Sequence, residues 1–359
     1  MRFSIRNIIN YFGSLVIAAV FLYLAFRGMD FDQIWQATKN VNIFWTLMIL
    51  PCLFVSHFFR AWRWQYLLIP VKNRVSLRNS WSALMIGYMA NNVLPRAGEF
   101  VRPFSLGKLE KISKSSALGS VLFERILDIL SFLLILIVIL FFIHQKVSSA
   151  FPEFVFLGFR LSIMTFVIVL SIIEAVGTGM IGLLVFKREL GTKIFDLAFR
   201  FLPKKLSQRA HRILHSLLDG FLSMKDTKNY LMIILLSIIT WGLYAFMMYF
   251  PLLAFEKMPA DARTLPAAIV LLAISNIGIV IPTPGSIGTY HFFVIQTLQR
   301  IYSVDAGQAM SYAVVTHAMG FISTTFVGLA YFIKDHLSLK ETLQADFNSN
   351  ADQPANGEH

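Results

Sequence analysis

Three ionisable side chains interrupt a long apolar run at positions 124, 125 and 128. Glu124 and Asp128 are four residues apart, so a helix places both carboxylates on one face, with Arg125 on the adjacent face. Charged groups at membrane depth are costly and usually face a protein interior or a wet cavity. The pattern predicts a functional site, with an internal salt-bridge cluster that fixes helix packing as the alternative.

A second polar cluster follows a short apolar stretch. Arg96, Glu99 and Arg102 are three residues apart and share one face if the segment is helical. Pro95 and Gly98 would break regular structure there and free backbone groups. Because an arginine fork donates two hydrogen bonds to a phosphate, an anionic headgroup is a natural ligand. An ordinary basic cytoplasmic loop is the alternative.

A third cluster lies inside an apolar run, where residues 282–291 have the sequence PTPGSIGTYH. Its two prolines and two glycines, Gly285 and Gly288, break a helix. A helix that restarts near Gly288 would point its positive N-terminal end at an anion. The freed amides could line a polar site together with five side chains: Thr283, Ser286, Thr289, Tyr290 and His291. A tight structural turn is the alternative.

Other polar residues in the apolar runs have simpler interpretations. Asn91, Asn92 and Asn276 could equally cap the hairpin arms or contact a ligand. His317 is interpreted as a packing residue, and Glu174 as the mark of a kink or a proton-linked carboxyl. One further group is interpreted as an interface anchor with its aromatic rings at headgroup level: Arg60, Ala61, Trp62, Arg63 and Trp64.

The composition predicts a membrane protein. Of the 359 residues, 56% are hydrophobic and 14% are charged, against about 25% charged in a soluble domain. The net charge of +12 does not indicate nucleic-acid binding, because lysine and arginine lie in the gaps between apolar runs. The single cysteine, Cys52, excludes an internal disulfide, and the sequence has no metal-binding, nucleotide-binding or hydrolase motif. We therefore expect no metal, no cofactor and no catalytic residue.

Six apolar runs are long enough to cross a hydrocarbon core, which takes about 20 helical residues. They predict an all-α polytopic fold with spans at 8–27, 43–60, 116–143, 155–186, 229–254 and 308–333. Two further stretches, 79–94 and 265–300, are short or broken and have flanks of matching charge, so we expect re-entrant hairpins there. Lysine and arginine concentrate on one side of this arrangement, which predicts that both termini are cytoplasmic.

The same order of span, span, hairpin and span occurs in residues 8–143 and again in residues 155–333, starting from opposite sides of the membrane. It predicts an inverted repeat within a single membrane domain, 1–335, whose halves are joined by an extracytoplasmic loop. The basic amphipathic segment 187–228 is expected to lie on the cytoplasmic leaflet. The polar residues 336–359 predict a disordered tail.

Three motifs, in order along the chain, resemble the flippase-like membrane region of the lysylphosphatidylglycerol synthase family. They are Asn-Asn-x-Leu-Pro-x-x-Gly-Glu-x-x-Arg at 91–102, Glu-Arg-x-x-Asp at 124–128 and Pro-Thr-Pro-Gly-x-x-Gly-x-Tyr-His at 282–291. The resemblance covers about residues 8–335. It implies a multi-pass protein of the bacterial cytoplasmic (inner) membrane that handles lipids or lipid-linked sugars.

The resemblance has two limits. In bifunctional members of the family a separate cytosolic domain aminoacylates phosphatidylglycerol, and this sequence contains no such domain, so that activity is not expected. Ser286 stands where many relatives have a second glycine, and His291 stands near a position where many have glutamate. The coupling chemistry of the second hairpin is therefore not carried over from the family.

The repeat, the hairpins and the buried charges favour a flippase-like transporter of an anionic or polyprenyl-phosphate-linked lipid over an enzyme. Arg96, Arg102 and Arg125 would meet the headgroup. Three acidic side chains would hold those arginines or exchange protons: Glu99, Glu124 and Asp128. The alternatives are a membrane-embedded transferase, an accessory subunit of a glycosyltransferase or lipid-modifying enzyme, and a scaffold. The expected partner is a membrane lipid, with a separate lipid-modifying enzyme as the other candidate.

Overall fold

The structure is a computed structural model, and it describes residues 5–28, 31–150, 154–156, 159–161 and 227–335, with a few isolated positions between 165 and 176. Several sequence expectations lie outside these described residues: most of the span 155–186, Glu174, the segment 187–228 except its last two residues, and the tail 336–359.

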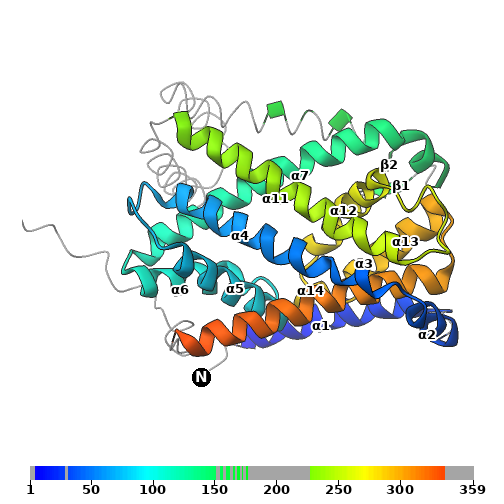
Figure 1. Ribbon diagram of the computed structural model, residues 1–359, viewed down its shortest axis with the longest axis horizontal. Helices are drawn as coiled ribbons and strands as arrows, with labels where there is room; N and C mark the ends of the chain where they lie inside the picture. Colours follow the sequence, from blue (N-terminus) through cyan, green and yellow to red (C-terminus); the bar gives the residue numbers. More distant parts are fainter. Residues whose placement is uncertain are drawn as a thin grey trace, which may run out of the picture.

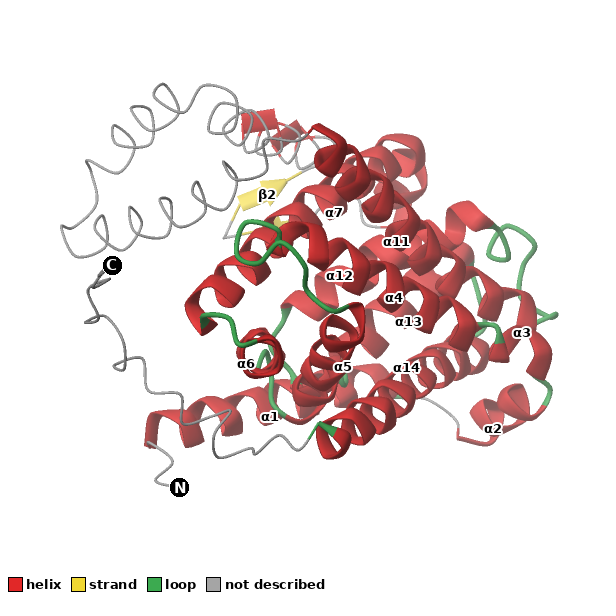
Figure 2. Cartoon of the chain, turned by 60° about the vertical axis from the view of Figure 1, so that its left-hand side comes forward, coloured by secondary structure: helices red, strands yellow, loops and turns green. Residues whose placement is uncertain are grey.

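Long helices lie side by side along the long axis of the molecule (Figure 1). They are α1 (Ile5–Phe26), α4 (Ile49–Leu68), α7 (Lys114–Ala150), α11 (Thr227–Ala254) and α14 (Ala306–Lys334). Shorter helices connect them: α2 (Phe31–Lys39), α3 (Ile43–Leu47), α5 (Leu77–Val93), α6 (Gly98–Glu110), α12 (Leu265–Val280), the 3₁₀ turn η1 (Pro284–Ser286) and α13 (Thr289–Tyr302). Helices make up nearly all of the described chain (Figure 2).

Three helical stretches in the described part of the chain are long and apolar enough to cross a membrane: 43–68, 229–254 and 306–334. Their outer faces suit lipid, because large apolar side chains are exposed there at helical spacing. Leu231, Ile234 and Ile238 form such a stripe on α11, and Ile322 and Phe326 begin one on α14. These stripes confirm the predicted α-helical membrane class, since a protein surrounded by water rarely exposes such contiguous apolar surface.

Two helical hairpins lie at opposite ends of the bundle (Figure 1). In the first hairpin, α5 packs against α6, and in the second, α12 packs against α13. Each breaks where the sequence has its proline and glycine cluster, at 94–97 in the first hairpin and at 281–288 in the second. We call these breaks the hairpin tips.

The two tips meet inside the bundle, where η1 packs against α5. Gly285 has a φ of +54°, in the left-handed region that favours glycine. A Cβ on Gly285 would lie 2.6 Å from the ring of Phe321 and 3.5 Å from the Cα of Asn92. Glycine is therefore required for this close approach between the second tip, the first hairpin and α14.

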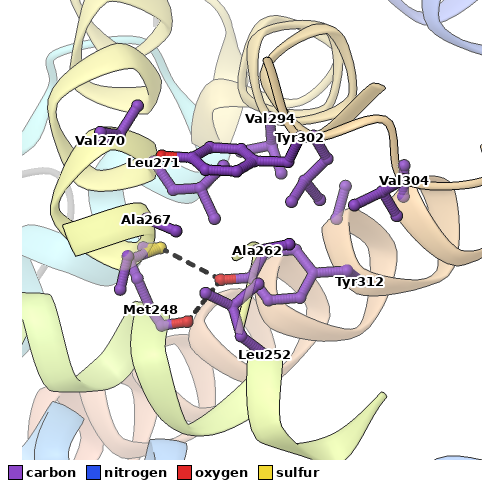
Figure 3. Close-up of a cluster of buried hydrophobic side chains, with 14 of the residues drawn as sticks. Met248, Leu252, Ala262, Ala267, Val270, Leu271, Val294, Tyr302, Val304 and Tyr312 are labelled. Carbon is purple, nitrogen blue, oxygen red and sulfur yellow. Dashed lines mark hydrogen bonds between the residues drawn. The ribbon is translucent and has the colours of Figure 1, made fainter. Parts of the chain in front are cut away.

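The main apolar core lies between α11, α12, α13 and α14, and Figure 3 shows part of it. Tyr312 is fully buried there, and its hydroxyl donates to the Met248 carbonyl oxygen at 2.7 Å. Leu252 and Leu271 pack beside it without exposure to solvent. The core holds the second hairpin firmly against α11 and α14.

One end of the bundle carries the basic connections between helices. Arg78, at the start of α5, pairs with Asp335 just after α14, and Lys72 pairs with Glu110 at the end of α6. The opposite end joins α3 to α11, where the Asn42 amide donates to the Ala254 carbonyl oxygen at 3.1 Å.

The predicted span 155–186 is wrong at its start. Phe154–Phe156 (β1) and Phe159–Leu161 (β2) form an antiparallel two-stranded hairpin, with Phe156 opposite Phe159. Five of the first seven residues assigned to the span are thus extended. The aromatic and branched residues of this stretch suit a pleated strand as well as an apolar helix, so apolarity alone did not separate the two.

The glycine contact inside the first hairpin generates a first prediction. A Cβ on Gly98 would lie 2.1 Å from the Gly87 carbonyl oxygen, so Gly98→Ala must push α5 and α6 apart. We expect a loss of about 1–3 kcal/mol in the free energy of unfolding, measured by thermal denaturation in detergent. Gly119→Ala on α7 is the control, because nothing lies within 4 Å of its Cβ position. Equal losses in both variants would contradict the tight contact.

The basic end generates a second prediction. Burial raises the pKa of Glu110, but hydrogen bonds from Lys72, Asn79 and the Ser76 amide outweigh burial and hold the pKa below its usual value. The wild type should therefore be more stable than Glu110→Gln above the ordinary carboxyl pKa, about 4.3. The difference should shrink as the pH falls below that value, because protonation abolishes the charge that these bonds stabilise. Thermal denaturation between about pH 7 and about pH 3 measures it. Glu256→Gln, at an exposed position in the connection between α11 and α12, is the control variant measured over the same pH range.

Candidate functional site

Two arginines of α4 meet two carboxylates of α7 inside the bundle. Arg60 donates from Nε to Glu124 Oε1 at 2.7 Å and from Nη2 to Asp128 Oδ2 at 2.6 Å. Arg63 donates from Nη2 to Asp128 Oδ1 at 2.6 Å. The three-residue spacing on α4 and the four-residue spacing on α7 each place two side chains on one helix face. The facing pairs fix α4 and α7 in one register.

The first hairpin joins this network through Arg102 on α6. Arg102 donates from Nη2 to Glu124 Oε2 at 2.6 Å. Its guanidinium lies over the Trp64 ring, 3.8 Å from the ring centroid, an arrangement that attracts a cation to an aromatic face. Trp64 is held in turn by donation from Nε1 to Ser120 Oγ at 2.9 Å. The hairpin is therefore bound both to α4 and to α7.

Helix α11 completes the network with two hydroxyl acceptors. Arg60 Nη1 donates to Tyr244 Oη at 3.2 Å, and Arg63 Nη1 donates to Ser237 Oγ at 2.9 Å. Four helices thus converge on one group of charges. We call it the arginine cluster and define it by five side chains: Arg60, Arg63, Arg102, Glu124 and Asp128.

The arginine cluster is buried and carries an unbalanced charge. Arg63 and Glu124 are 0% exposed, and Arg102 is 5% exposed. Three guanidinium groups face two carboxylates, which leaves one positive charge in excess. Among the described residues, Nε of Arg102 is also buried without a hydrogen-bond partner. A buried cation without an equal anion is costly, so the arrangement favours an anionic ligand.

A small polar cavity lies beside the arginine cluster, under the tip of the first hairpin. It encloses about 40 Å³, room for roughly three water molecules. Four helices line it: Arg60 from α4; Leu84, Gly87, Tyr88 and Asn91 from α5; Gly98, Glu99 and Arg102 from α6; Val121 and Arg125 from α7. The Glu99 and Arg125 side chains are 36% and 41% exposed and 3.6 Å apart, so this pair lies at the mouth of the cavity.

Of the site residues predicted in the first hairpin, some line the cavity and others lie away from it. Asn91 Oδ1 accepts from the Gly98 amide at 2.7 Å and so bridges the tip. Arg96 is exposed, has a φ of 59° and does not line the cavity. The condition for a common face of Arg96, Glu99 and Arg102 is therefore not met, because α6 begins only at Gly98 and Arg96 precedes it.

The second hairpin forms a separate polar group that does not line this cavity. The buried hydroxyls of Thr283 and Thr289 lie 3.2 Å apart across the tip, and the Tyr290 hydroxyl lies 2.9 Å from that of Thr316 on α14. The other predicted residues of this hairpin make local contacts or turns. Gly288, with a φ of +84°, precedes α13, and Ser286, with a φ of 58°, lies in the turn before it. Asn276 Nδ2 donates to the Leu272 carbonyl oxygen within its own helix.

Asn92 links the first hairpin to α14 instead of capping α5. Its Nδ2 donates to Thr325 Oγ1 at 2.8 Å, and it also lies 3.1 Å from Thr324 Oγ1 and 3.2 Å from the Phe321 carbonyl oxygen. The side chain therefore faces the second half of the chain, at the level where the two tips meet.

The interpretation of Arg60 and Arg63 as an interface anchor is wrong, because both side chains are buried at the centre of the bundle. Their signal was present in the sequence as two arginines at a spacing of three residues in an apolar span. Tyr88 and His57 were also missed. Their rings stack with centroids 4.3 Å apart, and among the described residues neither ring nitrogen of His57 has a hydrogen-bond partner.

A comparison with models of protein families assigns the chain to a family. The model of the lysylphosphatidylglycerol synthase TM region matches residues 11–328. The chain belongs to this family. The predicted resemblance is therefore confirmed, and the matched residues of this lysylphosphatidylglycerol synthase TM region include the arginine cluster and both hairpins.

Two curated relatives are similar along most of their length. A UPF0104 membrane protein of Methanocaldococcus jannaschii is 23% identical over 324 residues, which cover 88% of this chain and 91% of the relative. A UPF0104 membrane protein of Methanothermobacter thermautotrophicus is 24% identical over 327 residues, which cover 88% and 93%. The family and its relatives support a membrane-embedded protein.

The charge balance of the cluster generates a third prediction. Glu124→Gln leaves three buried guanidinium groups facing one carboxylate, so we expect a loss of about 3–5 kcal/mol in the free energy of unfolding. Glu99→Gln is the control because its carboxylate is partly exposed and pairs only at 3.6 Å, so we expect a loss of about 1 kcal/mol or less. Thermal denaturation in detergent measures both. A Glu124 variant as stable as the control would contradict the central role of this carboxylate.

Proposed function

We propose that this protein moves an anionic lipid, or a lipid carrying a phosphate-linked headgroup, between the leaflets of the cytoplasmic membrane. The observation that carries the proposal is the buried arginine cluster, with one positive charge in excess, beside a polar cavity under the first hairpin tip. A phosphate or similar anion in this cavity would balance that charge.

The cavity has the donors that an anionic headgroup needs. Arg60 and Arg102 face it with guanidinium groups that Glu124 already orients. Tyr88 and Asn91 add neutral polar groups to the lining. Guanidinium groups held in a fixed direction lose little conformational entropy when they bind an oxyanion, which favours binding.

The mouth of the cavity suggests how a headgroup enters. The cavity of about 40 Å³ has room for a few water molecules, and separation of α6 and α7 at its mouth would widen it for a headgroup. The Glu99–Arg125 pair lies at this mouth at 3.6 Å, a distance that makes it a weak, partly exposed ion pair. An incoming phosphate would replace Glu99 as the partner of Arg125, which opens the mouth without leaving a cation unpaired.

The arrangement of the helices supports transport. We propose that residues 8–143 and 155–333 form an inverted repeat, that the two hairpins are re-entrant, and that both termini are cytoplasmic. In support, the hairpins lie at opposite ends of the bundle and the basic connections gather at one end (Figure 1). In inverted-repeat transporters, broken helices meet near the middle of the membrane and form the substrate site.

A transferase is less well supported, because the carboxylates that would act as a base or bind a metal are already occupied. Glu124 accepts from Arg60 and Arg102 on its two oxygens, and Asp128 accepts from Arg60 and Arg63 on its two oxygens. Both carboxylates would have to give up these hydrogen bonds before they could accept a proton from a substrate or bind a metal.

The proposal is tested with purified protein in liposomes that contain trace fluorescent phosphatidylglycerol, phosphatidylcholine or a fluorescent polyprenyl phosphate. Transfer between leaflets is followed by reduction of the dye exposed outside. We expect faster transfer of at least one anionic lipid, and a loss of about tenfold or more in Arg125→Ala, since a hydrogen bond to a charged group contributes about 1.5–3 kcal/mol.

Arg263→Ala is the matched control, because Arg263 lies in the connection between α11 and α12, away from the cavity. Gel filtration shows whether each variant is folded. The proposal is wrong if the wild type accelerates neither phosphatidylglycerol nor the polyprenyl phosphate, or if Arg263→Ala slows transfer as much as Arg125→Ala does.

A further inference from the structure

Two histidines are in contact where the second hairpin tip meets α14. The ring centroids of His291 on α13 and His317 on α14 lie 4.7 Å apart. His291 is 6% exposed, and among the described residues its Nδ1 has no hydrogen-bond partner. His317 Nε2 lies 2.8 Å from the Gly285 carbonyl oxygen. We call these two residues the histidine pair.

The surroundings of the histidine pair are neutral. Tyr290 is the adjacent titratable group, and its hydroxyl is bonded to Thr316. Neighbouring elements bring uncharged groups to this region: Phe21 from α1, Asn92 from α5, Met248 from α11 and Gly278 from α12. Charged residues on the packed helices belong to other parts of the bundle: Asp32 and Lys39 on α2, Arg78 at the start of α5, Arg300 nine positions along α13, Lys334 at the end of α14, and the arginine cluster on α4, α6 and α7.

This environment allows the pair to bind a single proton. Two imidazoles in contact repel each other when both are charged, so the second proton is strongly disfavoured. Histidine changes its charge near pH 6.5 in water. A dry, neutral pocket favours the uncharged pair, whereas a tip that opens to water allows one proton to bind.

A path of direct contacts joins the histidine pair to the polar cavity beside the arginine cluster. His317 contacts the Gly285 carbonyl oxygen of the second tip, and the Phe321 ring, one turn along α14, lies against Gly285. Asn92 of the first hairpin donates to the Phe321 carbonyl oxygen and to Thr325. Asn91, the residue before it, lines the polar cavity and bridges the first tip. A shift of α14 or of the second tip therefore reaches the first hairpin within a few residues.

We propose that the histidine pair is the coupling-ion site of this protein and that the ion is a proton. The pair binds one proton when the second hairpin tip is wetted, and releases it when the tip closes on α14. This inference rests on the proposed lipid transport, since it assigns the ion whose movement accompanies the lipid. The first hairpin then carries the anion and the second hairpin carries the proton.

The test uses two measurements with separate outcomes. In the liposome assay, a pH difference of one unit across the membrane should change the rate of lipid transfer by up to tenfold, the factor that one proton contributes per pH unit. In His317→Gln and His291→Gln this dependence should disappear. Glutamine can still donate to the Gly285 carbonyl oxygen but does not titrate, so His317→Gln preserves the contact while removing the proton site.

The second measurement does not depend on transport. The chain has eight histidines, so nitrogen NMR of the ¹⁵N-histidine-labelled protein in nanodiscs compares the wild type with the two variants. We expect one ring signal of the wild type to show protonation as the pH falls from about 8 to about 5 and to be absent from both variants, while the signals of the other histidines remain. Lipid transfer that ignores the pH gradient in the wild type, or keeps its pH dependence in both variants, overturns the proton site. If the ring signal titrates as expected while the wild type moves no lipid, the proton site stands and the proposed lipid transport fails.

Discussion

The Glu124 carboxylate, fully buried among three guanidinium groups, is the interaction on which the rest of the structure depends. In an apolar surrounding each of these charges needs a partner, and Glu124 is shared by arginines from α4 and α6. The same side chain therefore fixes the register of α4 against α7 and anchors the first hairpin. The remaining excess charge lies beside the polar cavity, where an anionic group would balance it.

The two hairpins have different chemistry although they occupy comparable places in the order of helices. The first hairpin meets charged side chains, and the second meets hydroxyls and imidazoles. Helix α14 touches both, through Asn92 on one side and Gly285 on the other. A Cβ on Gly328, further along α14, would lie 2.5 Å from the Met85 carbonyl oxygen, so this helix also packs closely against α5. Such close packing leaves little room for either hairpin to move without displacing α14.

The sequence predicted much of this arrangement because the decisive signals are local. Apolar length indicated the long helices, and the prolines and glycines near Gly98 and Gly285 indicated the breaks between hairpin arms. The spacing of Glu124 and Asp128 predicted a shared face, and both contact Arg60. The strands at 154–161 were missed, because an apolar stretch of this composition is compatible with either a strand or a helix.

What the sequence by itself determined is the membrane class, the position of the helix breaks and which side chains are too polar for lipid. Only the tertiary structure decided how those side chains are paired. Arg60 and Glu124 are 64 residues apart, and Asn92 and Thr325 are 233 residues apart. Spacing along one helix says which face a side chain occupies but not which other helix covers that face. For this reason Arg60 and Arg63 could be taken for an anchor at the membrane surface, although packing places them at the centre of the site.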